Sequence, residues 1–62
     1  MNKQEQIAIA EKRIAECEER RNYFVKKSIE CPENKGLYEK MAETETEAID
    51  QIREAIIEAL LK

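Results

Sequence analysis

The chain has 62 residues, 40% of them charged and 42% hydrophobic, and a formal net charge of −3. A chain this short forms one small domain and buries only about 60% of the surface that it exposes when unfolded, so its stability is marginal and oligomerisation is expected. No apolar run approaches the roughly 18 residues of a membrane span, and the polar start MNKQEQ lacks the apolar core of a signal peptide. These features favour a cytoplasmic protein without a membrane partner.

The composition also indicates the fold class. One glycine, one proline and many Ala, Glu, Lys, Ile and Arg residues favour long helices over sheet, so we expect a single all-α domain over residues 1–62. The hydrophobic fraction argues against wholesale disorder. Cys17 and Cys31 would lie about 21 Å apart on one helix, beyond the roughly 7 Å limit for a disulfide, and we expect reduced thiols.

The first expected element is a helix over about residues 3–30. Apolar or small side chains recur along it at alternating three- and four-residue steps and form a seam, the row of side chains that faces a partner helix. Arg21 breaks this row, which consists of Ile7, Ala10, Ile14, Cys17, Phe24, Ser28 and Cys31. On the outer face, Arg13, Arg20 and Lys27 form a basic row with a seven-residue repeat, roughly 10.5 Å per step.

The segment CPENKG, residues 31–36, is expected to be the turn because it combines the proline, an asparagine and the single glycine. Pro32 disfavours helical geometry at Cys31, so the second helix is expected to begin between Asn34 and Leu37. In the alternative, Pro32 is the first residue of the second helix and Gly36 lies inside it. Either connection is so short that the two helices are expected to be antiparallel neighbours.

The second expected helix covers about residues 35–61. Its seam has one break, Glu45, and consists of Tyr38, Ala42, Ile49, Ile52, Ile56 and Ala59. Its carboxylates follow one another at three- or four-residue steps and lie within an arc of about 100°. We call this row the acidic stripe; its members are Glu39, Glu43, Glu47, Asp50, Glu54 and Glu58.

The two seams fit one antiparallel register. If Cys17 lies opposite Ile49, then several layers combine a large and a small side chain, as interdigitated packing favours, and Arg21 lies opposite Glu45. The sequence therefore predicts an Arg21–Glu45 ion pair, with the hypothesis that the pair fixes the register because sliding the seam would leave buried charges unpaired. In the alternative, both side chains reach solvent at the edge of a narrow seam.

Apolar residues outside the seam predict self-association. Two helices cannot cover their seam, and the additional apolar surface suits two hairpins that dimerise into a four-helix bundle. The residues expected to mediate this homodimer are Ile9, Val25, Ile29, Met41, Ile57 and Leu61, with Leu37 broadening the same surface near the turn. The alternative is that these residues form a docking patch for a different protein.

The charged rows have competing interpretations. The acidic stripe is either a solvated face that keeps the bundle soluble or a docking face for a basic surface. The basic row of Arg13, Arg20 and Lys27 could follow a phosphate backbone, but Glu16 is placed to pair with Arg20 and the negative net charge opposes non-specific nucleic-acid binding.

Catalysis is not expected. The chain has no His, no Gly-rich phosphate loop and no CxxC motif, so the sequence predicts no catalytic residues, no cofactor, no metal site and no small-molecule substrate. Cys17 lies in the seam, where it is expected to act as a small hydrophobic residue. The sequence thus favours a non-enzymatic protein-binding module, regulator or inhibitor, with an RNA-binding regulator as the alternative.

Overall fold

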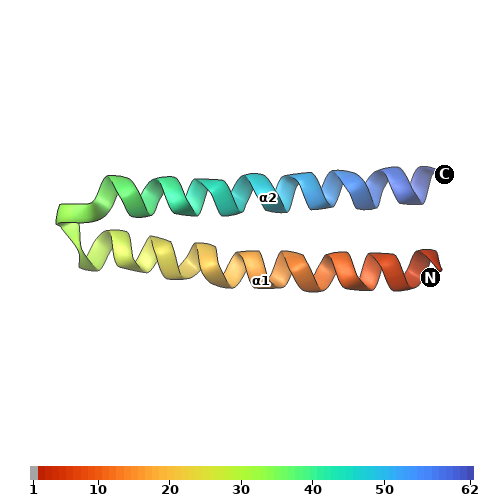
Figure 1. The fold of residues 1–62 in the computed structure, drawn as a ribbon, viewed down its shortest axis with the longest axis horizontal. Coiled ribbons are helices and arrows are strands. Elements are labelled where there is room, and N and C mark those ends of the chain that lie inside the picture. Colours follow the sequence, from red (N-terminus) through yellow and green to blue (C-terminus); the bar gives the residue numbers. More distant parts are fainter. Residues whose placement is uncertain (1) are drawn as a thin grey trace.

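The computed structural model describes residues 2–62 and shows two long antiparallel helices joined by a short turn (Figure 1). Helix α1 covers Lys3–Glu30, the 3-10 turn η1 covers Pro32–Asn34, and helix α2 covers Lys35–Leu61. The two helices lie side by side along their whole length, and the longest dimension of the molecule is 46 Å. The expected all-α antiparallel hairpin is confirmed.

Helix α1 has a defined beginning and end. At its start, the side-chain oxygen of Asn2 accepts a hydrogen bond of 2.8 Å from the backbone N–H of Glu5, which satisfies one of the unpaired donors of the first turn. At its end, Cys31 leaves helical geometry with φ −120° and ψ 77°, because the following proline ring disfavours the helical region. The last turn closes with the Cys31 N–H donating to the Lys27 carbonyl at 2.8 Å.

The second helix begins at Lys35, within the interval from Asn34 to Leu37 that the sequence predicts. Pro32 begins η1, and α2 follows directly at Lys35, so Gly36 lies in the first turn of α2 rather than in the connection. Its φ is not positive, and the N–H of Asn34 closes the turn by donating to the carbonyl of Cys31 at 3.0 Å. Proline therefore ends α1, and the alternative in which Pro32 is the first residue of the second helix is wrong, because Pro32 lies in the separate turn η1.

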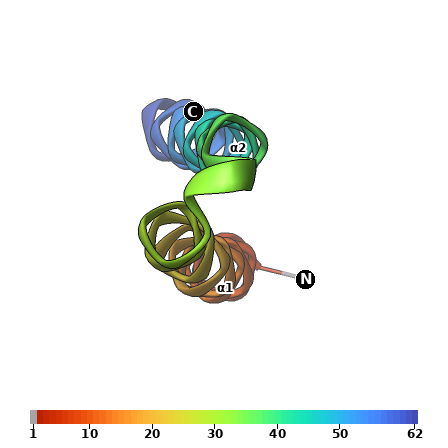
Figure 2. The same ribbon diagram turned by 90° about the vertical axis from the view of Figure 1, so that its left-hand side faces the viewer.

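The core is one narrow seam between the helices. Its centre is Ile49, which is only 2% exposed, together with Ile14 and Cys17 on α1. Ala48, Ile52 and Ile56 are partly buried and pack against this centre. Figure 2, which looks along the molecule from the turn, shows a single layer of two helices in which neither flank of the seam is covered by another described element.

Aromatic and polar contacts close the seam near the turn. The rings of Phe24 and Tyr38 stack across the helices with centroids 6.4 Å apart, and Tyr23 meets Phe24 edge-on at 5.6 Å. Ser28 is buried beside them, and its hydroxyl donates to the carbonyl of Val25 at 2.6 Å. The hydroxyl group is thus satisfied within its own helix, so the seam tolerates it.

Replacing the glycine of α2 is expected to stabilise the hairpin. A Cβ built at Gly36 meets nothing within 4 Å, and the backbone is helical there, so Gly36→Ala should remove conformational freedom from the unfolded chain without introducing a clash. We expect a gain of about 0.5–1 kcal/mol, or about 4 °C in the midpoint of thermal unfolding followed by circular dichroism at fixed concentration. A lower midpoint would show that residue 36 needs a conformation that only glycine adopts.

Candidate functional site

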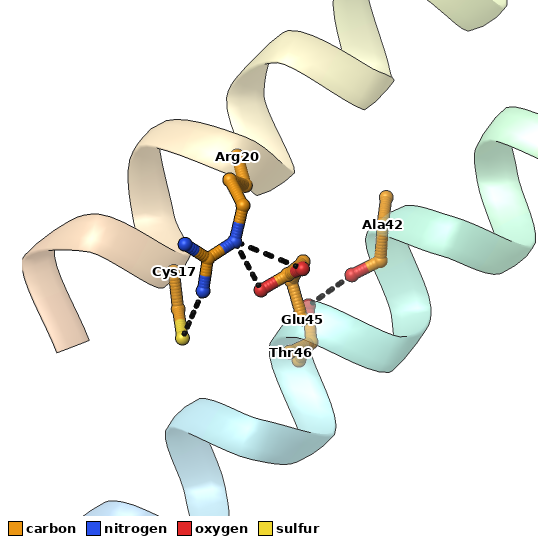
Figure 3. A network of polar contacts seen from close by, with 5 residues as sticks. All are labelled: Cys17, Arg20, Ala42, Glu45 and Thr46. Atoms are coloured by element: carbon orange, nitrogen blue, oxygen red, sulfur yellow. Dashed lines mark hydrogen bonds and ion pairs between the residues drawn. The ribbon is translucent and has the colours of Figure 1, made fainter. Parts of the chain in front are cut away.

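An ion pair joins the two helices beside the core. The Nε of Arg20 donates to both carboxylate oxygens of Glu45, at 3.1 Å to Oε1 and 3.2 Å to Oε2, and the two side chains point toward each other from facing helices (Figure 3). The Nη2 of Arg20 also lies 3.3 Å from the sulfur of Cys17. The carboxylate of Glu45, first by its hydrogen bonds and then by its charge, raises the pKa of Arg20 above its ordinary value.

The expected partner of Glu45 was Arg21, and this prediction is wrong. Arg21 lies half-buried at the seam position and forms no ion pair within residues 2–62, whereas the neighbouring Arg20 contacts Glu45. The exposed fractions indicate why. The Arg20 side chain is 53% exposed and that of Glu45 17% exposed, so a residue at the edge of the seam neutralises the carboxylate while its own guanidinium stays hydrated.

The basic row of α1 is largely engaged within the hairpin. Arg20 binds Glu45, and the ammonium group of Lys27 lies 3.8 Å from the carboxylate of Glu30 and 5.7 Å from the centre of the Tyr23 ring. Arg13 is exposed. The geometry therefore leaves less free positive charge along α1 than the sequence pattern alone indicates.

The acidic stripe lies on the outer side of α2. Its residues are all exposed and lie about 80–180° round the helix from Ile49, which faces α1. Only Glu39 forms an ion pair among the described residues, with Lys35 at 3.6 Å. The rest of the stripe presents its negative charge to solvent.

Exposed apolar residues occupy two opposite flanks of the hairpin. Every residue expected to mediate self-association is exposed: Ile9, Val25, Ile29, Met41, Ile57 and Leu61. By the 100° step of a helix, however, Ile9 lies about 160° from Val25 and Ile29 on α1, and Met41 lies about 160° from Ile57 and Leu61 on α2. The set therefore belongs to two surfaces. Leu60, which the sequence reasoning missed, is also exposed and extends the apolar cluster of the last turns of α2.

One flank is hollowed at two places. The first hollow, of about 160 Å³, is near the open end of the hairpin and is lined by Gln6, Ile7, Ala10, Ala55, Ile56 and Ala59. The second, of about 380 Å³, is near the middle and is lined by Arg13, Glu16, Cys17, Arg20, Ala48, Gln51 and Ile52. Ala48, Ile52, Ala55 and Ala59 lie within about 60° on α2, so both hollows belong to the same side, which we call the groove flank. Leu37 and Met41 lie within the same arc nearer the turn.

The remaining reactive groups show no assembled site. Both cysteines are free thiols, with Cys17 buried and Cys31 half-buried. Over residues 2–62, no three His, Cys, Asp or Glu side chains are grouped as metal ligands would be. Neither α1 nor α2 combines the length and the apolar character needed to cross a membrane.

Comparisons with protein-family models, with curated proteins and with solved structures gave no match to this chain. The candidate sites therefore depend on the geometry of the hairpin itself.

A double-mutant cycle should distinguish the two adjacent arginines. We expect Arg20→Ala and Glu45→Ala to be non-additive in the free energy of unfolding measured by urea denaturation, because each removes the same contact. The matched control is Arg21→Ala with Glu45→Ala, for which we expect additive losses. Coupling of Arg21 instead of Arg20 to Glu45 would contradict the geometry described above.

Proposed function

We propose that the hairpin is a small non-enzymatic binding module of the cytoplasm, a regulator or inhibitor that self-associates and binds a basic surface of another protein. The observation that carries the proposal is the outer side of α2, where the acidic stripe is exposed and Ile57 and Leu61 project within the same arc. The two free thiols agree with a reducing compartment.

The charge pattern of α2 supports a binding role. Carboxylates at helical neighbour spacing repel each other by a few tenths of a kcal/mol per pair, so the acidic stripe does not serve the stability of α2. A row of one charge steers an oppositely charged partner and suppresses wrong partners. Such a row contributes specificity more than affinity, which buried apolar anchors supply.

Ile57 and Leu61 provide such anchors. They are 55% and 82% exposed, they lie at the C-terminal end of the acidic stripe, and Glu54 and Glu58 lie within three residues of Ile57 on α2. An apolar centre beside a charged rim is the usual anatomy of a protein–protein interface. The partner that fits this surface has an apolar depression bordered by Lys or Arg residues.

The alternative of RNA binding depends on the basic row. Two of its three members already form ion pairs within the hairpin. Arg20 pairs with Glu45, and Lys27 pairs with Glu30. A phosphate backbone would therefore compete with internal ion pairs for these side chains. We favour a protein partner for this reason.

Neutralising the acidic stripe should abolish target capture. We expect the variant Glu47→Gln/Glu54→Gln to lose the protein retained by the immobilised wild-type chain from a lysate of cells that express it, with nuclease present and the retained protein identified by mass spectrometry. Raising the salt concentration should also reduce the amount of target that the wild-type chain retains, because salt screens the attraction between charges.

The matched control is Glu11→Gln/Glu19→Gln, which removes the same charge from exposed positions of α1. It should capture the target as well as the wild type. Loss of capture in both variants would show that capture depends on the net charge of the chain and not on the position of the acidic stripe. Retained material that disappears with nuclease and requires Arg13 and Lys27 would replace the proposal with nucleic-acid binding.

A further inference from the structure

The hairpin exposes more surface than its mass predicts. A compact monomer of 7.3 kDa is expected to expose about 4,200 Å², whereas this chain exposes 5004 Å². The excess, about 800 Å², is close to the area that each partner buries in a standard protein–protein interface. The exposed surface is thus sufficient for one further hairpin to pack against one flank.

The groove flank has large side chains near the turn, one hollow near the middle and another hollow near the open end. Near the turn, Leu37 is 60% exposed and Met41 is 37% exposed. Near the open end, the same arc of α2 carries Ala55 and Ala59, which line the hollow of about 160 Å³. Ala48 lies between them, seven residues from both Met41 and Ala55 and eleven residues from both Leu37 and Ala59. The arrangement is self-complementary about Ala48.

We infer that the groove flank is the interface between two copies of this chain, related by a two-fold axis that passes beside Ala48. In this arrangement the turn of one hairpin lies over the open end of the other. Met41 faces the partner's Ala55, and Leu37 faces the partner's Ala59, so each copy fills the hollow of the other. The small side chain of Ala48 allows the two α2 helices to approach closely at the axis.

The charges of α1 fit the same axis. Cys17 and Ile49 share the core cluster, and with these two residues opposite each other Ala48 lies level with Glu18 on α1. Glu16 and Arg20 then lie at equal distances on either side of that level. The two-fold axis therefore places Glu16 beside the partner's Arg20, and Arg20 beside the partner's Glu16. Arg20 uses Nε for Glu45 and Nη2 for Cys17, which leaves Nη1 to donate to the second carboxylate.

A second copy explains this flank better than an unrelated protein does. Both the large-to-small order along α2 and the opposite charges on α1 are matched by the chain's own residues under one rotation. The acidic stripe and Ile57 and Leu61 lie away from the groove flank and stay outside the dimer. The inference thus deepens the self-association in the proposed function, and the surface proposed for the target remains free.

A charge placed in the hollow should dissociate the dimer. We expect the wild type to be a dimer by sedimentation equilibrium at micromolar concentration, and Ala55→Glu to raise the dissociation constant about 100-fold or more, because a symmetric interface contains the substitution twice. Ala55 is exposed in the hairpin, so the substitution is compatible with folding, which circular dichroism checks. The matched control, Ala15→Glu, changes an exposed alanine that lies about 140–160° round α1 from Arg20 and Arg13 of the groove flank, and it should remain dimeric.

The outcomes separate this inference from the proposed function. A wild-type dimer that Ala55→Glu leaves intact would overturn the groove-flank interface but not self-association. A wild type that stays monomeric at high micromolar concentration would overturn both, while target capture through the acidic stripe is tested independently by the Glu47→Gln/Glu54→Gln variant. A monomeric wild type whose target capture is lost in Ala55→Glu would assign the groove flank to the target instead.

Cross-linking should locate the axis. Residues 41 and 55 lie about 21 Å apart along one helix, so a disulfide between them can form only between copies. In a Cys31→Ser background, we expect Met41→Cys/Ala55→Cys to form a covalent dimer with oxidised glutathione as the oxidant, with peptide mapping showing the 41–55 link. The control Lys40→Cys/Ala55→Cys, whose first cysteine lies about 100° away, should not link these positions. A control that links as efficiently would overturn the inferred axis.

Discussion

The contact of Ile49 with Ile14 and Cys17 is the interaction on which the rest of the structure depends. A pair of helices meets along one line, and only the side chains on that line are removed from water on both sides. Here the residues buried by the pairing are few, and Ile49 is the most deeply buried of them. Since hydrophobic stabilisation scales with the apolar area removed from water, the hairpin alone obtains little of it. The same geometry that makes the fold simple leaves its flanks uncovered.

This constraint explains how polar groups are distributed around the core. The carboxylate of Glu45 lies on the seam, where water is limited, and its partner is not the arginine on the facing seam but the one beside it. Burying both charges would require desolvating both, whereas Arg20 keeps its guanidinium hydrated and still reaches the carboxylate. Thr46 behaves similarly, since its hydroxyl donates to the carbonyl of Ala42 in its own helix at 3.2 Å and requires nothing from α1. Polar groups near the seam are therefore satisfied at its edges or locally.

The sequence predicted the fold but not the partner of Glu45, and the physical cause of each feature explains the difference. Helical periodicity is repeated many times along α1 and α2, so the fold class and the antiparallel arrangement could be derived from it, and Pro32 marked the end of α1 because its ring constrains the preceding residue.

The partner of Glu45 could not be derived in the same way. Arg20 and Arg21 are adjacent, and a long side chain can cross the about 100° between their positions, so Cβ direction alone does not choose between them. Gly36 lies in the first turn of α2, as a helix over residues 35–61 requires, because glycine permits a turn without requiring one and η1 already provides it.

The exposed apolar residues lie on two flanks of the hairpin, so one interface cannot use them all. If they all mediated one interface, Ile9 and Met41 would have to share it with residues about 160° away on the same helices, which no single packing of two hairpins allows. The groove flank combines hollows with the side chains that fit them and so suits an identical partner. The outer side of α2 combines Ile57 and Leu61 with six carboxylates and a single cation, Lys40. Among the described residues it therefore offers no basic surface that could pair with the same side of a second copy. Two copies joined through the groove flank would present two such acidic surfaces, and a target with two sites would then be bound with higher avidity than either surface provides alone.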